Sequence, residues 1–187
     1  VLASGRQWIL LGHSLQVAAG ATGVALLLGL PLAFLTARTN VPLRGLFSVL
    51  YAAPLFMPTY VVAICWRYFI GDVFGVHAVV ERWLSLDKAI WQAHGYSLCA
   101  FYLGLALFPM VTLTTRASLL AADPSLDEAA VLARGRRAAA LRVALRLATP
   151  GIVAGAAFVF LFSLSEFGVP NLLMINTYAI EVYSQFK

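Results

Sequence analysis

The sequence predicts an all-α integral membrane protein, on three observations. Hydrophobic residues make up 61% of the 187 residues and charged residues only 11%, which is far more apolar than a soluble domain of this length. The apolar residues gather in four runs of membrane-crossing length, at about 8–37, 46–67, 96–116 and 147–166. The arginines stand between these runs. We therefore expect a single transmembrane domain over residues 1–187, with four spanning helices.

The first run carries no formal charge between Arg6 and Arg38. As a helix it measures about 46 Å, against about 30 Å of hydrocarbon, so it crosses the bilayer with its ends in the interfaces. Four glycines would weaken such a helix in water, but in lipid small residues let neighbouring helices approach closely. We expect this packing role for the glycines of the run, which are Gly12, Gly20, Gly23 and Gly29.

The second run contains Pro54 and Pro58, which predict a bend or break because each proline removes a backbone donor. The sequence leaves open whether this kink lines a transport pathway or only serves packing. Residues 71–95 are mixed in character, and we expect them outside the cytoplasm with a short helix on the membrane surface. His77 and His94 lie there without a cluster of metal ligands.

The fourth run ends at Glu166. A carboxylate at the centre of a bilayer costs about 2.5–3.5 kcal/mol on insertion scales, so this one should lie at an interface or line an aqueous cavity. Residues 167–187 are too short and too polar to span, and we expect them outside the cytoplasm. The candidate pathway or gate residues are Pro54, Pro58, Glu166, Gly168 and Pro170.

Residues 123–146 form a polar, arginine-rich segment between the third and fourth runs. Pro124 suits the first position of a helix, and Ser125 with Glu128 three residues later forms a capping box. Gly135 is placed to end this short helix, and a second amphipathic pattern follows it. An arginine-rich loop of this kind is also what any polytopic membrane protein presents to the cytoplasm, or lays on anionic lipid, without further purpose.

Charge counts on the two sides of the four spans predict the orientation. Eight of the thirteen basic residues fall on the side of the arginine-rich segment, which the positive-inside rule places in the cytoplasm. The basic residues flank apolar runs and do not form an independent polar domain, so nucleic-acid binding is not expected. The spans also lack the paired carboxylates, metal cluster or activated nucleophile of a catalyst.

Several stretches resemble the permease subunits of ATP-binding-cassette importers. The sequence Glu128-Ala129-Ala130, with Gly135 after it and Pro150-Gly151 further on, resembles the conserved cytoplasmic loop of these subunits. Two features depart from that pattern: Gly135 follows Glu128 by seven residues where the family has six, and Arg146 stands where the family has proline. The resemblance extends to stretches typical of the iron(III)-type branch, which are 30–38, 54–60 and 166–170.

This resemblance implies a type I importer transmembrane domain of the bacterial inner membrane, with a short coupling helix inside the cytoplasmic loop 123–146. Four spans are fewer than the five or six of the family core, so we expect a partial chain. The implied partners are ATPase subunits that bind ATP and magnesium, a periplasmic or lipoprotein binding protein, a second permease domain (fused or in a homodimer) and the lipid bilayer. This chain itself would bind no cofactor or metal. The residues that would couple to the ATPase are Ser125, Asp127, Glu128, Ala129, Ala130, Arg134 and Gly135.

Other assignments remain open at this stage. Permeases for thiamine, polyamine, phosphonate or sulfate share much of the architecture that the iron(III) resemblance implies. A secondary transporter or channel subunit, which needs no ATPase, would require ionisable residues inside its spans, and Glu166 is the only candidate. A purely structural membrane subunit is the third alternative.

Overall fold

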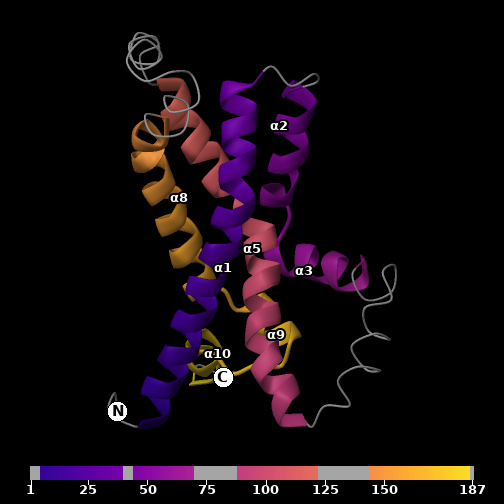
Figure 1. Ribbon diagram of the computed structural model, residues 1–187. Helices are drawn as coiled ribbons and strands as arrows, with labels where there is room; N and C mark the ends of the chain where they lie inside the picture. The colour runs from indigo at the N-terminus through magenta and orange to yellow at the C-terminus, as the bar shows by residue number, and fades with distance from the viewer. Residues whose placement is uncertain (1–4, 40–43, 70–87, 122–143, 186–187) are drawn as a thin grey trace.

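A computed structural model describes residues 5–39, 44–69, 88–121 and 144–185, and within these ranges the chain is helical with no strand. Three long helices form the body of the molecule (Figure 1). They are α1 (Gly5–Arg38), α5 (Lys88–Ala121) and α8 (Ala144–Ser165). All three are long and apolar enough to cross a membrane, and they coincide with the first, third and fourth predicted spans.

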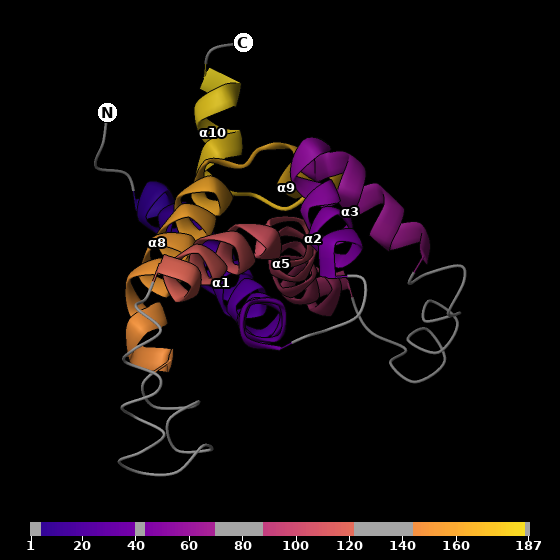
Figure 2. The ribbon, with the colours of Figure 1, turned by 90° about the horizontal axis from the view of Figure 1, so that it is seen from above.

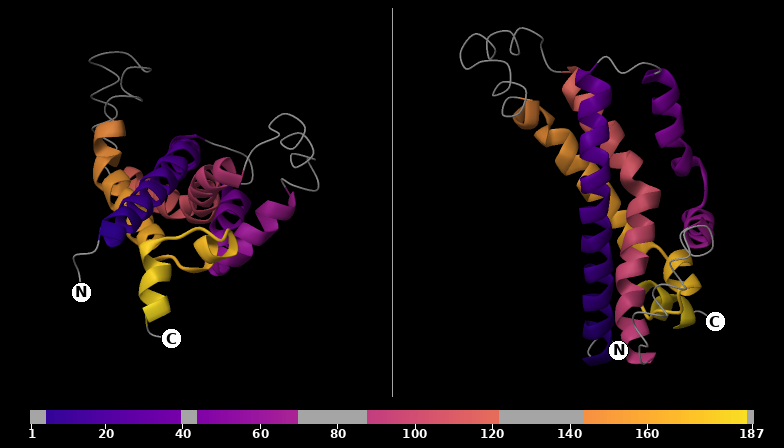
Figure 3. Two further views of the ribbon diagram at one scale, coloured as in Figure 1. Left: turned by 90° about the horizontal axis from the view of Figure 1, so that it is seen from below. Right: turned by 45° about the vertical axis from the view of Figure 1, so that its right-hand side comes forward.

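Helices α1 and α5 run parallel, whereas α8 runs antiparallel to both (Figures 1 and 3). The contacts show these directions, since Gly20 of α1 faces Ala100 of α5 and Gly29 faces Val111. Along α8 the order reverses, because Gly151 lies against Thr114 and Gly155 against Val111. Three apolar clusters fill the interfaces, and Val17, Leu103, Val111 and Val159 are among their most deeply buried members.

The packing role predicted for four glycines of α1 is confirmed for two of them, Gly20 and Gly29. A Cβ on Gly20 would lie 2.9 Å from Ala100 Cβ, and one on Gly29 would lie 2.9 Å from Phe108 O. Gly12 and Gly23 have no such neighbour within 4 Å, so the expected packing role is wrong for them within the described part of the chain. Near Gly29 the Thr112 hydroxyl also donates to the Gly29 carbonyl at 3.3 Å, joining α5 to α1.

The second predicted span is not one helix. It consists of α2 (Arg44–Ala52), a 3-10 turn η1 (Ala53–Phe56) and α3 (Thr59–Tyr68), with a bend of 109° at the break. Pro54 lies in the first turn of η1 and Pro58 is the N-cap of α3, so the break falls where the prolines predict it. The pair is either one broken span or a re-entrant segment, and α3 points away from the bundle (Figure 2).

Two boundaries also differ from those predicted. Helix α5 begins at Lys88, so residues 88–95, expected in an extracytoplasmic loop, are helical. Helix α8 begins at Ala144, three residues before the predicted start, and takes in Pro150. The surface helix expected near residues 79–84 lies outside the described residues. After α8 come two short helices that do not span, α9 (Gly168–Leu172) and α10 (Tyr178–Gln185).

Candidate functional site

Four helix ends lie at one end of the bundle (Figure 1), and two of them, the end of α5 and the start of α8, flank the arginine-rich segment. Helix α1 ends there at Arg38, α2 begins there at Arg44, α5 ends at Ala121 and α8 begins at Ala144. The seven coupling residues predicted between α5 and α8 lie outside the described residues. They are Ser125, Asp127, Glu128, Ala129, Ala130, Arg134 and Gly135.

The two helices that hold this segment are packed backbone to backbone. A Cβ on Gly155 would lie 2.8 Å from Val111 Cα, and one on Gly151 would lie 2.8 Å from the Thr114 carbonyl carbon and contact its oxygen. Glycines four residues apart let transmembrane helices approach this closely. Next to them, Leu119 of α5 packs with Ala144 and Ala148 of α8 in one buried cluster. The attachment points of the segment are therefore fixed relative to each other.

A second site lies at the junction of α3 and α9, where the structure brings together residues that the sequence singled out separately. A Cβ on Gly168 would lie 3.1 Å from Tyr60 Cβ, so α9 begins directly against the first turn of α3, which Pro58 caps. Pro170, two residues on, is buried. Pro54 is not placed in this junction, because η1, which contains it, packs on α5.

Glu166 holds the start of α9 through its side chain. Its Oε1 accepts a hydrogen bond of 3.0 Å from the Gly168 N–H, one of the donors that the first turn of a helix leaves without an internal partner. A hydrocarbon thickness of about 30 Å corresponds to about 20 helical residues. Counted along α8 from Arg146, that length ends near the partly exposed Glu166. On this count the carboxylate lies at the end of a membrane-crossing length, which is compatible with the interface that the sequence predicts for it.

Sequence reasoning missed a polar cluster that ties the C-terminal segment to α1 and α5. The Tyr96 hydroxyl lies 3.0 Å from His13 Nδ1 and donates to the Asn176 carbonyl at 3.3 Å. The Tyr178 N–H donates to Ser14 Oγ at 2.9 Å. These partners are about 80 residues or more apart in the chain, so no local pattern signals them.

The described residues contain no group of three or more His, Cys, Asp or Glu side chains that would hold a metal ion. Cys65 is exposed and Cys99 is buried, and both are free thiols. The described residues provide a bent helix pair, a short helix α9 whose first N–H is bonded by Glu166, and a closely packed pair of helices, α5 and α8. These are elements of a membrane scaffold.

Comparison with known proteins decides the family. Residues 26–187 match the family described as the binding-protein-dependent transport system inner membrane component. The chain belongs to this family. It is also similar to the inner membrane ABC transporter permease protein YdcU of Escherichia coli (strain K12), with 29% identity over 188 residues that cover 92% of this chain. The chain spans 60% of the length of that relative.

Membership of this permease family accounts for the fold. The chain is a multi-pass inner membrane protein, and its family is one of transport-system membrane components. The match includes the segment between α5 and α8, the α2–α3 break and the α9 junction, which therefore all belong to the permease domain.

Proposed function

We propose that this permease forms part of the translocation pathway of an ATP-driven importer and couples to ATPase subunits through residues 123–146. A periplasmic or lipoprotein binding protein would deliver the substrate from the side of Glu166, and a second permease domain would complete the pathway. ATP and magnesium would bind to the ATPase partners. The movement they cause would reach the bundle through α5 and α8.

The observation that carries this proposal is that α5 ends and α8 begins at the same end of the bundle (Figure 1), on two helices packed closely through Gly151 and Gly155. A helix inserted between such ends transmits a displacement to both, because packed helices move as a unit. The Glu128-Ala129-Ala130 stretch in this interval supports an ATPase as the partner, since its small residues suit a narrow cleft.

The proposed substrate is iron(III), supported by the resemblance of the 166–170 stretch to iron-type permeases. That stretch lies at the α3–α9 junction, beside the bent helix pair. Uptake of radiolabelled iron(III) by cells that express the complete system tests this assignment. Thiamine, a polyamine, phosphonate or sulfate as the transported species in the same assay would replace iron(III) without changing the proposed mechanism.

The coupling role is tested in proteoliposomes that contain the permease with its ATPase and loaded binding protein. Glu128→Lys should abolish stimulation of ATP hydrolysis by the binding protein, because it removes the capping carboxylate and reverses its charge. The matched control is Glu81→Lys, the same charge reversal in the segment predicted on the opposite side of the membrane. Stimulation that survives in Glu128→Lys at the control level would contradict the coupling role. Transport that continues without the ATPase would favour a secondary transporter or channel.

A further inference from the structure

Helix α10 lies across the bundle direction instead of along it. It appears end-on beside the long helices in Figure 1 and extends sideways from the bundle in Figure 2. Its start is fixed to α1 by the hydrogen bond from the Tyr178 N–H to Ser14 Oγ. A short helix held in this direction on a membrane bundle runs parallel to the bilayer plane.

The depth of α10 follows from the arginines at the other end of the bundle. About 20 helical residues cross the hydrocarbon. Counted from Arg146 in α8 and from Arg116 in α5, that length ends near Glu166 and Tyr96. The Tyr96 hydroxyl donates to the carbonyl of Asn176, two residues before α10 begins. Helix α10 therefore lies at the level of the extracytoplasmic interface.

The two faces of α10 suit such a position. Ala179, Val182 and Tyr183 lie on one side of the helix and line a hollow toward α8. Glu181 and Ser184 lie on the other side and share a hydrogen bond, from the Ser184 hydroxyl to the Glu181 carbonyl at 2.7 Å. A helix with one apolar and one polar face lies in the interface with the apolar face toward the acyl chains.

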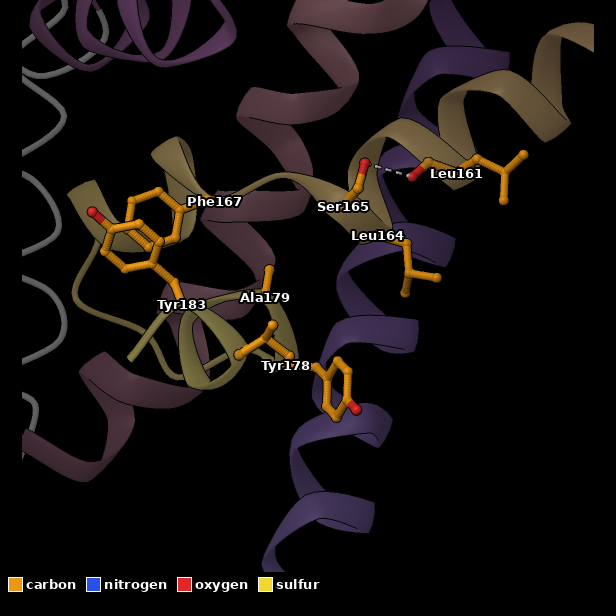
Figure 4. Close-up of a pocket in the computed structure, with 8 residues that line it drawn as sticks. Leu161, Leu164, Ser165, Phe167, Tyr178, Ala179 and Tyr183 are labelled. Atoms are coloured by element: carbon orange, nitrogen blue, oxygen red, sulfur yellow. Dashed lines mark hydrogen bonds between the residues drawn. The ribbon is translucent and has the colours of Figure 1, made fainter. Parts of the chain in front are cut away.

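The hollow between α10 and the last turns of α8 measures about 590 Å³ (Figure 4), within the range of about 300–1,000 Å³ for sites that hold small molecules. Its α8 wall is Leu161 and Leu164. The Ser165 hydroxyl, which also lines the hollow, donates to the carbonyls of Leu161 and Phe162 and is therefore not available as a donor to a molecule in the hollow. Phe167 and Tyr183 stack at one end with ring centroids 4.7 Å apart. The lining is thus almost wholly carbon.

We propose that α10 is an interfacial helix and that the hollow beneath it holds an acyl chain of an outer-leaflet phospholipid. The hollow continues the face of α8 on which Phe158, Leu161 and Phe162 are 50–60% exposed, a face turned to the surroundings of the bundle. Because the described α10 carries Glu181 and no basic residue, the contact with lipid is apolar and needs no anionic headgroup. The proposal depends on membrane insertion and on this face remaining uncovered by a second permease domain, and it does not depend on ATPase coupling or on the substrate.

The first test places a nitroxide label at Val182→Cys or Ser184→Cys, with Cys65 and Cys99 replaced by alanine, in vesicles of zwitterionic phosphatidylcholine. Label at position 182 should collide with oxygen and be shielded from a water-soluble nickel chelate, and label at 184 should show the reverse. Exposure of both positions to the chelate would place α10 in water and overturn the proposal. Shielding of position 182 from both reagents would show protein cover, by a second copy or another segment, and would overturn it too.

The second test asks whether the hollow retains lipid. Ala179→Trp fills it, whereas Ser184→Trp adds the same side chain on the other face of α10. Native mass spectrometry of the protein released from phosphatidylcholine nanodiscs should show a retained phospholipid in the wild type and in Ser184→Trp, and its loss in Ala179→Trp. Equal retention in both variants would overturn the acyl-chain site. The nitroxide pattern at position 182, which neither substitution occupies, provides the check that each variant keeps α10 in place.

Discussion

Gly151 gives the sharpest prediction about the helix pair that holds the arginine-rich segment. A Cβ added there would lie 2.8 Å from the Thr114 carbonyl carbon and closer still to its oxygen, more than half an ångström inside the 3.4 Å of ordinary contact. The neighbour is backbone in the middle of α5, so it cannot move aside as a flexible side chain would. Gly151→Ala must therefore push α8 away from α5.

Overpacking of this kind costs about 1–3 kcal/mol. At about 2–4 °C per kcal/mol for a chain of this size, the midpoint of thermal unfolding in detergent should fall by about 2–12 °C. The matched control is Gly23→Ala, since no side-chain or neighbouring-helix atom lies within 4 Å of a Cβ there. That variant should unfold at or slightly above the wild-type temperature, because alanine favours the helix. Equal midpoints for the two variants would refute the close approach of α5 and α8.

Three further predictions concern the end of the bundle that we expect outside the cytoplasm. Met174 has a φ of 54°, which costs a non-glycine residue about 1–2 kcal/mol, so Met174→Gly should raise the unfolding midpoint and Met174→Ala should not. Glu166→Gln keeps the acceptor for the Gly168 N–H and should retain wild-type stability, whereas Glu166→Ala should lose about 1–2 kcal/mol in the same assay; equal loss in both would assign the role to the charge. Tyr96→Phe removes the donor to the Asn176 carbonyl, so amide hydrogen exchange should accelerate in residues 174–185, and unchanged exchange there would show that the contact does not hold this segment.

The sequence is sufficient to predict those elements that depend only on composition along the chain. The apolar runs predicted three of the spans, and Pro54 and Pro58 predicted the break that separates α2, η1 and α3. The predicted start of the third span, at residue 96, is wrong, because polar residues after Lys88 indicate a loop in the sequence whereas α5 already begins at Lys88. A helix of 34 residues is about 51 Å long, so its first turns pass beyond the hydrocarbon, where polar side chains are compatible with a helix.

The sequence does not predict the contacts between helices, for a different reason. In a membrane bundle the core and the lipid are both apolar, so the hydrophobic pattern does not reveal which face of α1 is turned inward. Gly20 and Gly29 face α5 while Gly12 and Gly23 do not, although all four glycines lie in similar surroundings in the sequence. The contact of Tyr96 with His13 likewise depends on the rotation and register of two helices.

The proposed coupling role requires residues 124–135 to face the cytoplasm within reach of an ATPase. The most direct measurement uses Ala130→Cys in a Cys65→Ala background, since Cys65 is exposed and Cys99 is buried. In sealed inside-out membrane vesicles, a membrane-impermeant maleimide should label position 130, and a short bifunctional reagent should cross-link it to the ATPase subunit. Labelling only in right-side-out vesicles, or labelling without a cross-link to the ATPase, would contradict the account.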